Sequence, residues 1–126
     1  MKYYAPLGAT FYGKDLTMRL RKENDLMHED EIILVAQVSD ALAHPARIKI
    51  YQYIMQCNKD RVNVCNKDVV AAFDYSQATI SQHIKKLVEA DLVQIKKIDK
   101  CSMYYANIGK LMKYLDATRK FSTFQA

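Results

Sequence analysis

The chain has 126 residues, and half of them are hydrophobic. A chain of this length can bury one modest core and is too short to suggest two independent domains. Lysine and arginine outnumber aspartate and glutamate by 19 to 14. This balance suits a polyanionic partner, although many unrelated proteins share it. No stretch approaches the roughly 20 apolar residues needed to cross a bilayer, so we expect a cytoplasmic protein without a membrane partner.

The N-terminal region differs in composition from the rest of the chain. Residues 1–14 combine proline and glycine with aromatic residues, which favours an extended arm over a regular element. Residues 15–28 place apolar side chains on one helical face and predict an extra helix. We therefore divide the chain into an N-terminal segment, residues 1–28, and a main domain, residues 29–126.

Two amphipathic helices are predicted at the start of the main domain. Acidic residues open the first, Asp30–Ala43, whose apolar residues recur at helical spacing. Pro45 biases His44 away from helical geometry and suits the first turn of a new helix, so the boundary falls at His44. The second helix ends near Asn58, and its apolar face consists of Ala46, Ile50, Tyr53, Ile54 and Cys57.

A pair of closely spaced helices comes next. Residues 66–74 can form a short helix, and Tyr75 links it to a helix that begins after the N-cap residue Ser76. The second helix of this pair runs to about Ala90, and its apolar stripe consists of Ile80, Ile84, Leu87 and Val88. Two helices joined by so short a turn indicate a helix-turn-helix.

The remaining segments predict a β-hairpin and a final helix. Residues 92–98 and 103–108 favour strands on either side of a turn at residues 99–102. Apolar residues then recur at helical spacing from Ile108 to about Phe121. The predicted fold is mainly α with a small β-hairpin wing, which is a winged helix-turn-helix.

The helix after Ser76 has the layout of a DNA-reading element. A helix fits the major groove, where polar side chains near its N-terminus reach base edges and cations meet phosphates. Taken alone, such a face is more often an ordinary solvated surface. A preceding short helix, a tight turn and a lysine-bearing hairpin together favour double-stranded DNA as the partner. The candidate side chains are Gln77, Thr79, Ser81, Gln82, Lys85 and Lys86 on the helix and Lys96, Lys97 and Lys100 on the hairpin.

Four stretches carry a resemblance to a known family. Leu42–Ile48 (LAHPARI), Tyr75–Ile84 (YSQATISQHI), Leu92–Val93 and Tyr104–Tyr105 resemble the ArsR/SmtB transcriptional repressors. The resemblance spans about residues 30–121, and the second stretch is its most specific part.

The resemblance implies a winged-helix homodimer that assembles through its first and last helices. Such a dimer binds a palindromic operator and represses transcription until an inducer releases it. The resemblance also implies that His83 orients the recognition helix or touches phosphate, while a purely structural role for this residue stays open. The DNA contacts that it implies are Ser76, Gln77, Thr79, Ser81 and Gln82.

The sensor is less well marked than the DNA-binding element. Many family members bind metal through a Cys-x-Cys pair ahead of the recognition helix, but here Asn63 occupies the first position and only Cys65 remains. Relatives with zinc between their last helices use histidines, which residues 109–121 lack. No cofactor is therefore expected to be required, and the metal is unknown.

The three cysteines are expected to be free thiols. Cys65 and Cys101 are candidate sensor thiols because Lys67 and Lys100 are their sequence neighbours and cations favour thiolates. Cys57 is better read as a core residue, because it lies on an apolar stripe. Binding of an arsenic or zinc ion by these thiols and a reversible disulfide between them both remain open.

These observations leave two functional hypotheses. The first is a sequence-specific, dimeric transcriptional repressor whose inducer is unknown, with a metal ion and a thiol oxidant as the candidates. The alternative is a winged-helix protein-interaction or architectural module without an inducer site. Salt dependence separates them, because neutralising several phosphates makes DNA binding strongly salt-sensitive. An enzyme is not expected, since the sequence lacks a Gly-rich phosphate loop, a paired-carboxylate motif and a nucleophile elbow.

Overall fold

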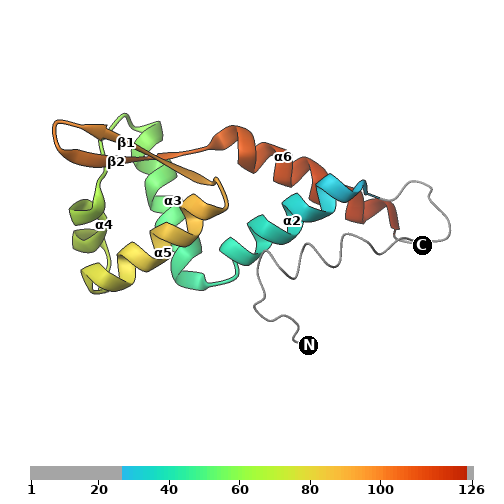
Figure 1. Cartoon of the computed structure of the whole chain (residues 1–126), viewed down its shortest axis with the longest axis horizontal. Helices are drawn as coiled ribbons and strands as arrows, with labels where there is room; N and C mark the ends of the chain where they lie inside the picture. The colour runs from blue at the N-terminus through green and yellow to red at the C-terminus, as the bar shows by residue number, and fades with distance from the viewer. Residues whose placement is uncertain (1–26, 125–126) are drawn as a thin grey trace.

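Figure 1 shows the computed structural model, which describes residues 27–124. Its elements confirm a mainly α fold with one antiparallel hairpin. The predicted N-terminal arm and the predicted helix 15–28 lie outside the described residues, apart from Met27 and His28, which precede the first described helix. In chain order the elements are α2 (Glu29–Ala41), α3 (Pro45–Lys59), α4 (Asn66–Ala72), α5 (Gln77–Glu89), β1 (Val93–Ile98), β2 (Cys101–Ala106), α6 (Ile108–Arg119) and a 3-10 helix (Lys120–Phe124).

The elements form two regions, which we call the head and the helix pair. The head consists of α3, α4, α5 and the hairpin β1–β2, and the helix pair consists of α2 and α6, which lie side by side and extend away from the head (Figure 1). Tyr114 of α6 shares a hydrogen bond of 3.0 Å with the hydroxyl of Ser39. The ammonium of Lys120 donates to the carboxylate of Glu31 at 2.8 Å. In the part of the chain that the structure describes, no helix could span a membrane.

The hydrophobic core lies mainly in the head. Ile54, Ile80 and Leu87 are fully buried and bring α3 and α5 together, and Leu92 adds the start of the hairpin. Val38 of α2 is also fully buried in this core, so the helix pair is attached to the head through one end of α2. Burial of apolar surface is the dominant favourable term in folding, and here it fixes α5 against α3.

Local capping signals explain where the helices begin. His44 is extended, and its ring nitrogen Nδ1 accepts a hydrogen bond of 3.1 Å from the amide of Ala46, which confirms the predicted boundary before Pro45. The ends of two helices differ from the prediction. The first ends at Ala41 instead of Ala43, and α4 ends at Ala72 because Phe73 is extended. That early end of α4 allows the ring of Phe73 to pack edge-on against Tyr53 at 5.7 Å.

The hairpin turn is shorter than predicted. Residues 99–102 were expected to form the turn, but β2 begins at Cys101, which pairs with Ile98. Asp99 and Lys100 form the whole turn with φ values of 51° and 68°. Two successive residues with positive φ are characteristic of a two-residue hairpin turn, whose twist matches that of the flanking strands. The prediction was therefore wrong for Cys101 and Ser102, which lie in a strand.

The hairpin is held by Asn58 of α3 and by the loop before α4. The side-chain amide of Asn58, at the end of α3, donates to the carbonyl of Tyr104 at 3.2 Å and accepts from the amide of Ala106 at 2.8 Å. The loop before α4 also forms an isolated antiparallel bridge, in which Cys65 lies opposite Met103. These contacts satisfy backbone groups on the outer edge of β2 and so fix the position of the hairpin.

Candidate nucleic-acid interface

The polar side of α5 faces away from the molecule. Gln77, Ser81, Gln82, Lys85 and Lys86 are all exposed. On the opposite side of the same helix, its apolar stripe is buried in the core of the head. The structure therefore confirms the predicted orientation of the helix. It does not test contact with DNA, which stays a prediction for these residues.

The N-terminus of α5 is held by its cap residue. The hydroxyl oxygen of Ser76 accepts a hydrogen bond of 3.2 Å from the amide of Thr79, which confirms Ser76 as the N-cap. The same hydroxyl lies 3.0 Å from the side-chain oxygen of Thr79. Thr79 is half-buried, in contrast to the predicted outward position. Its hydroxyl oxygen is engaged by the cap, because it accepts the hydrogen bond that the hydroxyl of Ser76 donates.

His83 of α5 is half-buried at the edge of the polar face, next to side chains from the start of α3. The guanidinium of Arg47 is 3.5 Å from Nδ1 of His83, and the ring of His44 is 4.8 Å away between centroids. Burial lowers the pKa of His83, and electrostatic interactions with His44 and Arg47 lower it further. The neutral ring can accept from Arg47 through Nδ1, which leaves Nε2–H as a donor.

Arg47 is a site residue that the sequence analysis missed. Its side chain donates to the carbonyl of Ala41 at 2.6 Å and to that of Asp40 at 3.2 Å, at the C-terminus of α2. Arg47, at the start of α3, thus connects the end of α2 with His83 of α5. The sequence offered one local indication of this role. Arg47 places a positive charge in the first turn of α3, where the helix dipole does not favour it.

Asn66 is a second residue that sequence patterns did not reveal. Its amide nitrogen lies 3.3 Å from the hydroxyl of Ser81 and 3.4 Å from that of Tyr104. The first contact connects α4 to α5, and the second connects α4 to β2. Asn66 therefore fixes how the recognition helix and the hairpin are presented relative to each other.

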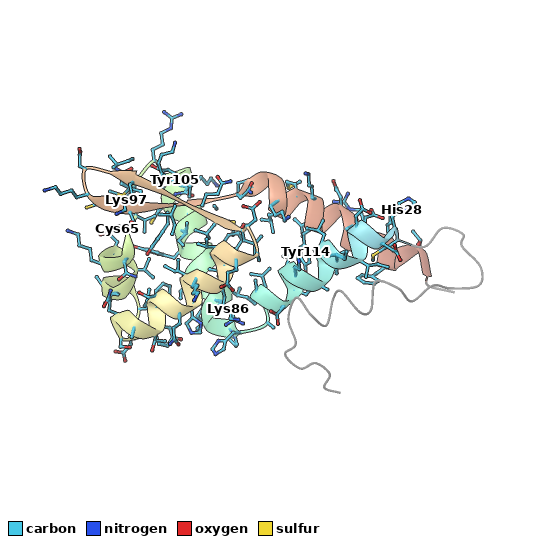
Figure 2. The ribbon with its side chains drawn as sticks, in the orientation of Figure 1. His28, Cys65, Lys86, Lys97, Tyr105 and Tyr114 are labelled. Atoms are coloured by element: carbon cyan, nitrogen blue, oxygen red, sulfur yellow. The ribbon has the colours of Figure 1, made fainter. Side chains whose placement is uncertain are left out.

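The hairpin presents the three predicted lysines at the surface. Lys96, Lys97 and Lys100 are exposed, and β1 contacts α5. Lys96 extends over the ring of Tyr105, with its ammonium 5.6 Å from the centroid. Figure 2 shows Lys97 on the hairpin and Lys86 on α5. The head thus presents cations on both elements that the prediction assigned to nucleic acid, as phosphate contacts require.

The three cysteines are all free thiols, as expected. Cys57 is half-buried and packs against the core, in agreement with its predicted packing role. Cys65 is the N-cap residue of α4, and its thiol donates to the carboxylate of Asp68 at 3.2 Å. Hydrogen bonds from the amide and thiol of Cys65 lower the pKa of Asp68. Within residues 27–124 no three His, Cys, Asp or Glu side chains are grouped so as to hold a metal.

Sequence comparison relates the chain to known regulators. A model of a helix-turn-helix domain family matches residues 42–95. The arsenical resistance operon repressor of Staphylococcus xylosus is 30% identical over 73 residues, or 58% of this chain. The chain spans 65% of the length of that curated relative.

Solved structures show the same fold. An ArsR-like transcriptional regulator from Rhodococcus sp. RHA1 superposes with a TM-score of 0.64 at 20% identity, covering 73% of this chain and 82% of its own. NolR from Sinorhizobium fredii gives a TM-score of 0.58 at 21% identity, covering 82% of this chain and 96% of its own. The fold, the matched helix-turn-helix domain and the similarity to a repressor all indicate the same kind of protein. The chain therefore has the winged helix-turn-helix fold of these regulators, and its helix-turn-helix region is similar in sequence to the arsenical resistance operon repressor.

Proposed function

We propose that the chain is a dimeric, sequence-specific DNA-binding repressor of transcription, without catalytic activity. The observation that carries this proposal is the outward polar face of α5, supported from behind by a buried apolar stripe. The related protein of Staphylococcus xylosus is named as a repressor, which supports the same function. Double-stranded DNA is the partner whose groove dimensions accept such a helix.

The two kinds of exposed side chain would have different tasks. Gln77 and Gln82 would read base edges, because a glutamine amide can pair bidentately with adenine, and Ser81 would add an adaptable hydrogen bond. The remaining candidates would bind the phosphate backbone and set the position of the helix without reading sequence. These phosphate-binding candidates are Ser76, His83, Lys85, Lys86, Lys96, Lys97 and Lys100.

The helix pair supplies a surface for a second copy of the chain. Ile108, Met112 and Leu115 lie on one face of α6 and are 41% to 49% exposed. Ile32 of α2 and Phe121 are also exposed, at 51% and 55%. Exposed apolar residues at helical spacing indicate an interaction surface. Two copies joined through α2 and α6 would present two recognition helices to one palindromic site.

The DNA proposal is tested by replacing Gln77 and Gln82 together with alanine. We expect the preference for the selected operator over random DNA to fall by at least about 30-fold, because each of the two lost base contacts removes about 1–3 kcal/mol of discrimination. Weak, salt-sensitive binding should remain, since the phosphate contacts are intact. Competition binding to labelled operator, selected from a random pool with the wild-type protein, measures both quantities.

Matched variants make this test specific. Gln52→Ala, at an exposed glutamine of α3, should leave the preference unchanged. The double variant Lys96→Ala, Lys97→Ala should weaken binding to all DNA sequences alike. It should also reduce the slope of log affinity against log salt concentration by about 2. Binding that is insensitive to salt would contradict the proposal and favour a protein-interaction module.

A further inference from the structure

A cavity lies along one side of α3, where Phe73 packs against that helix. It has a volume of about 600 Å³, within the range of roughly 300–1,000 Å³ that small-molecule sites occupy. Side chains of α3 form most of the wall, and Phe73, which follows the end of α4, completes it. None of the side chains proposed to contact DNA belongs to its lining.

Two aromatic rings form an apolar part of the wall. The rings of Tyr53 and Phe73 meet edge to face, with centroids 5.7 Å apart and an interplanar angle of 81°. Both side chains are only half-buried, so part of each remains accessible. Met55 adds a thioether, which makes favourable contacts with aromatic rings. A flat aromatic group suits this wall, because rings attract one another in edge-to-face and offset geometries beyond the effect of buried area.

The charged part of the lining is positive. Lys49 and Lys59 are exposed and line the cavity, four residues before Tyr53 and six residues after it. In the part of the chain that the structure describes, neither ammonium group forms an ion pair. The carboxylate of Asp60, which is outside the lining, already accepts a hydrogen bond of 3.1 Å from Gln56. An anionic group on a ligand can therefore pair with a lysine that has no other partner.

A row of rings connects this cavity with the recognition helix. Phe73 stacks with Tyr75 at 6.3 Å, and Tyr75 meets His83 of α5 edge to face, also at 6.3 Å. Tyr75 directly precedes Ser76, the N-cap residue of α5. A group that packs against Phe73 therefore acts on the turn that sets the position of α5, because closely packed side chains transmit displacements.

We propose that this cavity is an effector site for a small aromatic carboxylate. The ring of the ligand packs against Tyr53 and Phe73, and its carboxylate pairs with Lys49 or Lys59. The ring competes with the contact between Tyr53 and Phe73, so binding favours a different position of the turn and of α5. Affinity for DNA falls, because the ligand binds the displaced arrangement better. The effect on DNA rests on the proposed repressor function, whereas binding of the carboxylate does not.

The binding test is a titration of the reduced, full-length protein with benzoate, followed by NMR at an ionic strength kept constant with sodium chloride. We expect saturable shifts that are largest at Tyr53 and Phe73 and smaller at Tyr75 and His83. Benzamide lacks the charge and cyclohexanecarboxylate lacks the aromatic ring. Each should bind at least about 10-fold more weakly than benzoate, since each loses one of the two interactions.

Variants of the lining locate the site. The double variant Lys49→Gln, Lys59→Gln should lose at least about 10-fold in benzoate affinity, because no cation remains in the lining. Lys113→Gln, at an exposed lysine of α6, is the matched control and should bind as the wild type does. Phe73→Leu keeps an apolar side chain but interrupts the row, so benzoate should no longer shift the signals of His83. Thermal unfolding of each variant checks the fold.

DNA affinity is then measured with and without saturating benzoate. We expect a loss of at least about 5-fold for the wild type, the lower end of typical coupling between sites, and an equal loss of benzoate affinity in the presence of DNA. The double lysine variant should show no loss at the same benzoate concentration.

Several results would overturn the proposal. These are wild-type benzoate affinity in the double lysine variant, equal binding of the three probes, shifts centred away from Tyr53 and Phe73, or unchanged DNA affinity at saturating benzoate. A protein that binds no DNA in the absence of benzoate would contradict the repressor proposal. The benzoate titration, which needs no DNA, would still decide whether the cavity binds an aromatic carboxylate.

Discussion

The head and the helix pair use apolar residues in opposite ways. In the head, the apolar residues of α3 and α5 are buried against one another, as Ile54, Ile80 and Leu87 show. In the helix pair, Ala117 is the one buried residue of α6, while Met112 and Leu115 are exposed. The head thus completes its own core within one chain, whereas the helix pair leaves apolar surface without a cover in one chain.

This difference matches two requirements of the proposed DNA-binding dimer. A recognition helix must keep a fixed orientation, which the closed core of the head provides, because close-packed interiors resist deformation. A subunit interface must be complementary to a second copy, so its apolar residues stay at the surface of each chain. Substitutions in the two regions should therefore differ in their effects on stability and on association.

The largest effect is expected in the head. Leu87 is fully buried, so Leu87→Ala should lower the free energy of unfolding by about 2–5 kcal/mol through lost contacts and a cavity. Leu115→Ala, at a position 41% exposed, is the matched variant in the helix pair and should cost about 1 kcal/mol or less in the monomer. Urea unfolding at low protein concentration measures both, and equal losses would contradict the distinction between the regions.

The second prediction concerns association. Leu115→Asp places a charge on the exposed apolar face of α6, so the dimer should weaken by about 100-fold, or about 2.7 kcal/mol, because a charge buried without a partner is costly. Lys113→Ala, on a different face of the same helix, should leave dimerisation unchanged. Sedimentation equilibrium measures the dissociation constant. A dimer of unchanged affinity in the aspartate variant would place the interface elsewhere.

A smaller effect is expected at the N-terminus of the recognition helix. Ser76→Ala removes the cap to the amide of Thr79 and should cost about 1 kcal/mol of stability. Ser76→Asp should restore that stability, since aspartate is an equally good cap, yet it should weaken DNA binding by repelling phosphate. Thermal unfolding and DNA titration of both variants separate the two roles. Equal DNA affinity in the aspartate variant would argue against phosphate near this residue.

The smallest effect concerns the ion pair within the helix pair. The hydrogen bond from Lys120 lowers the pKa of Glu31 below its ordinary value of 4.5. Because the folded pKa is depressed, the contribution of Glu31 to stability is present above the unfolded pKa and is lost as the pH falls through the folded pKa. Lys120→Gln should therefore flatten this acid-side slope slightly in unfolding curves. An identical slope in wild type and variant would show that the pair contributes nothing.

Much of the architecture follows from local patterns in the sequence. Pro45 after His44 sets the start of α3, Ser76 sets the start of α5, and helical spacing of apolar residues identifies the buried side of the recognition helix. These features act between residues close in sequence, so they can be read without coordinates. For the candidate interface, the sequence alone determined the outward position of Gln77 and Gln82 and the exposure of the hairpin lysines.

Tertiary structure decided the features that join distant segments. Because Asp99 and Lys100 form the whole turn, Cys101 lies in β2. The bridge between Cys65 and Met103 places Cys65 near this strand, so Cys65 and Cys101 line the same cavity. The contact of Arg47 with His83 likewise joins residues from separate helices. Such pairings depend on strand register and on how packed helices meet, and a one-residue change of register moves a strand's side chains to the opposite face. Residue spacing within one segment carries no information about that register.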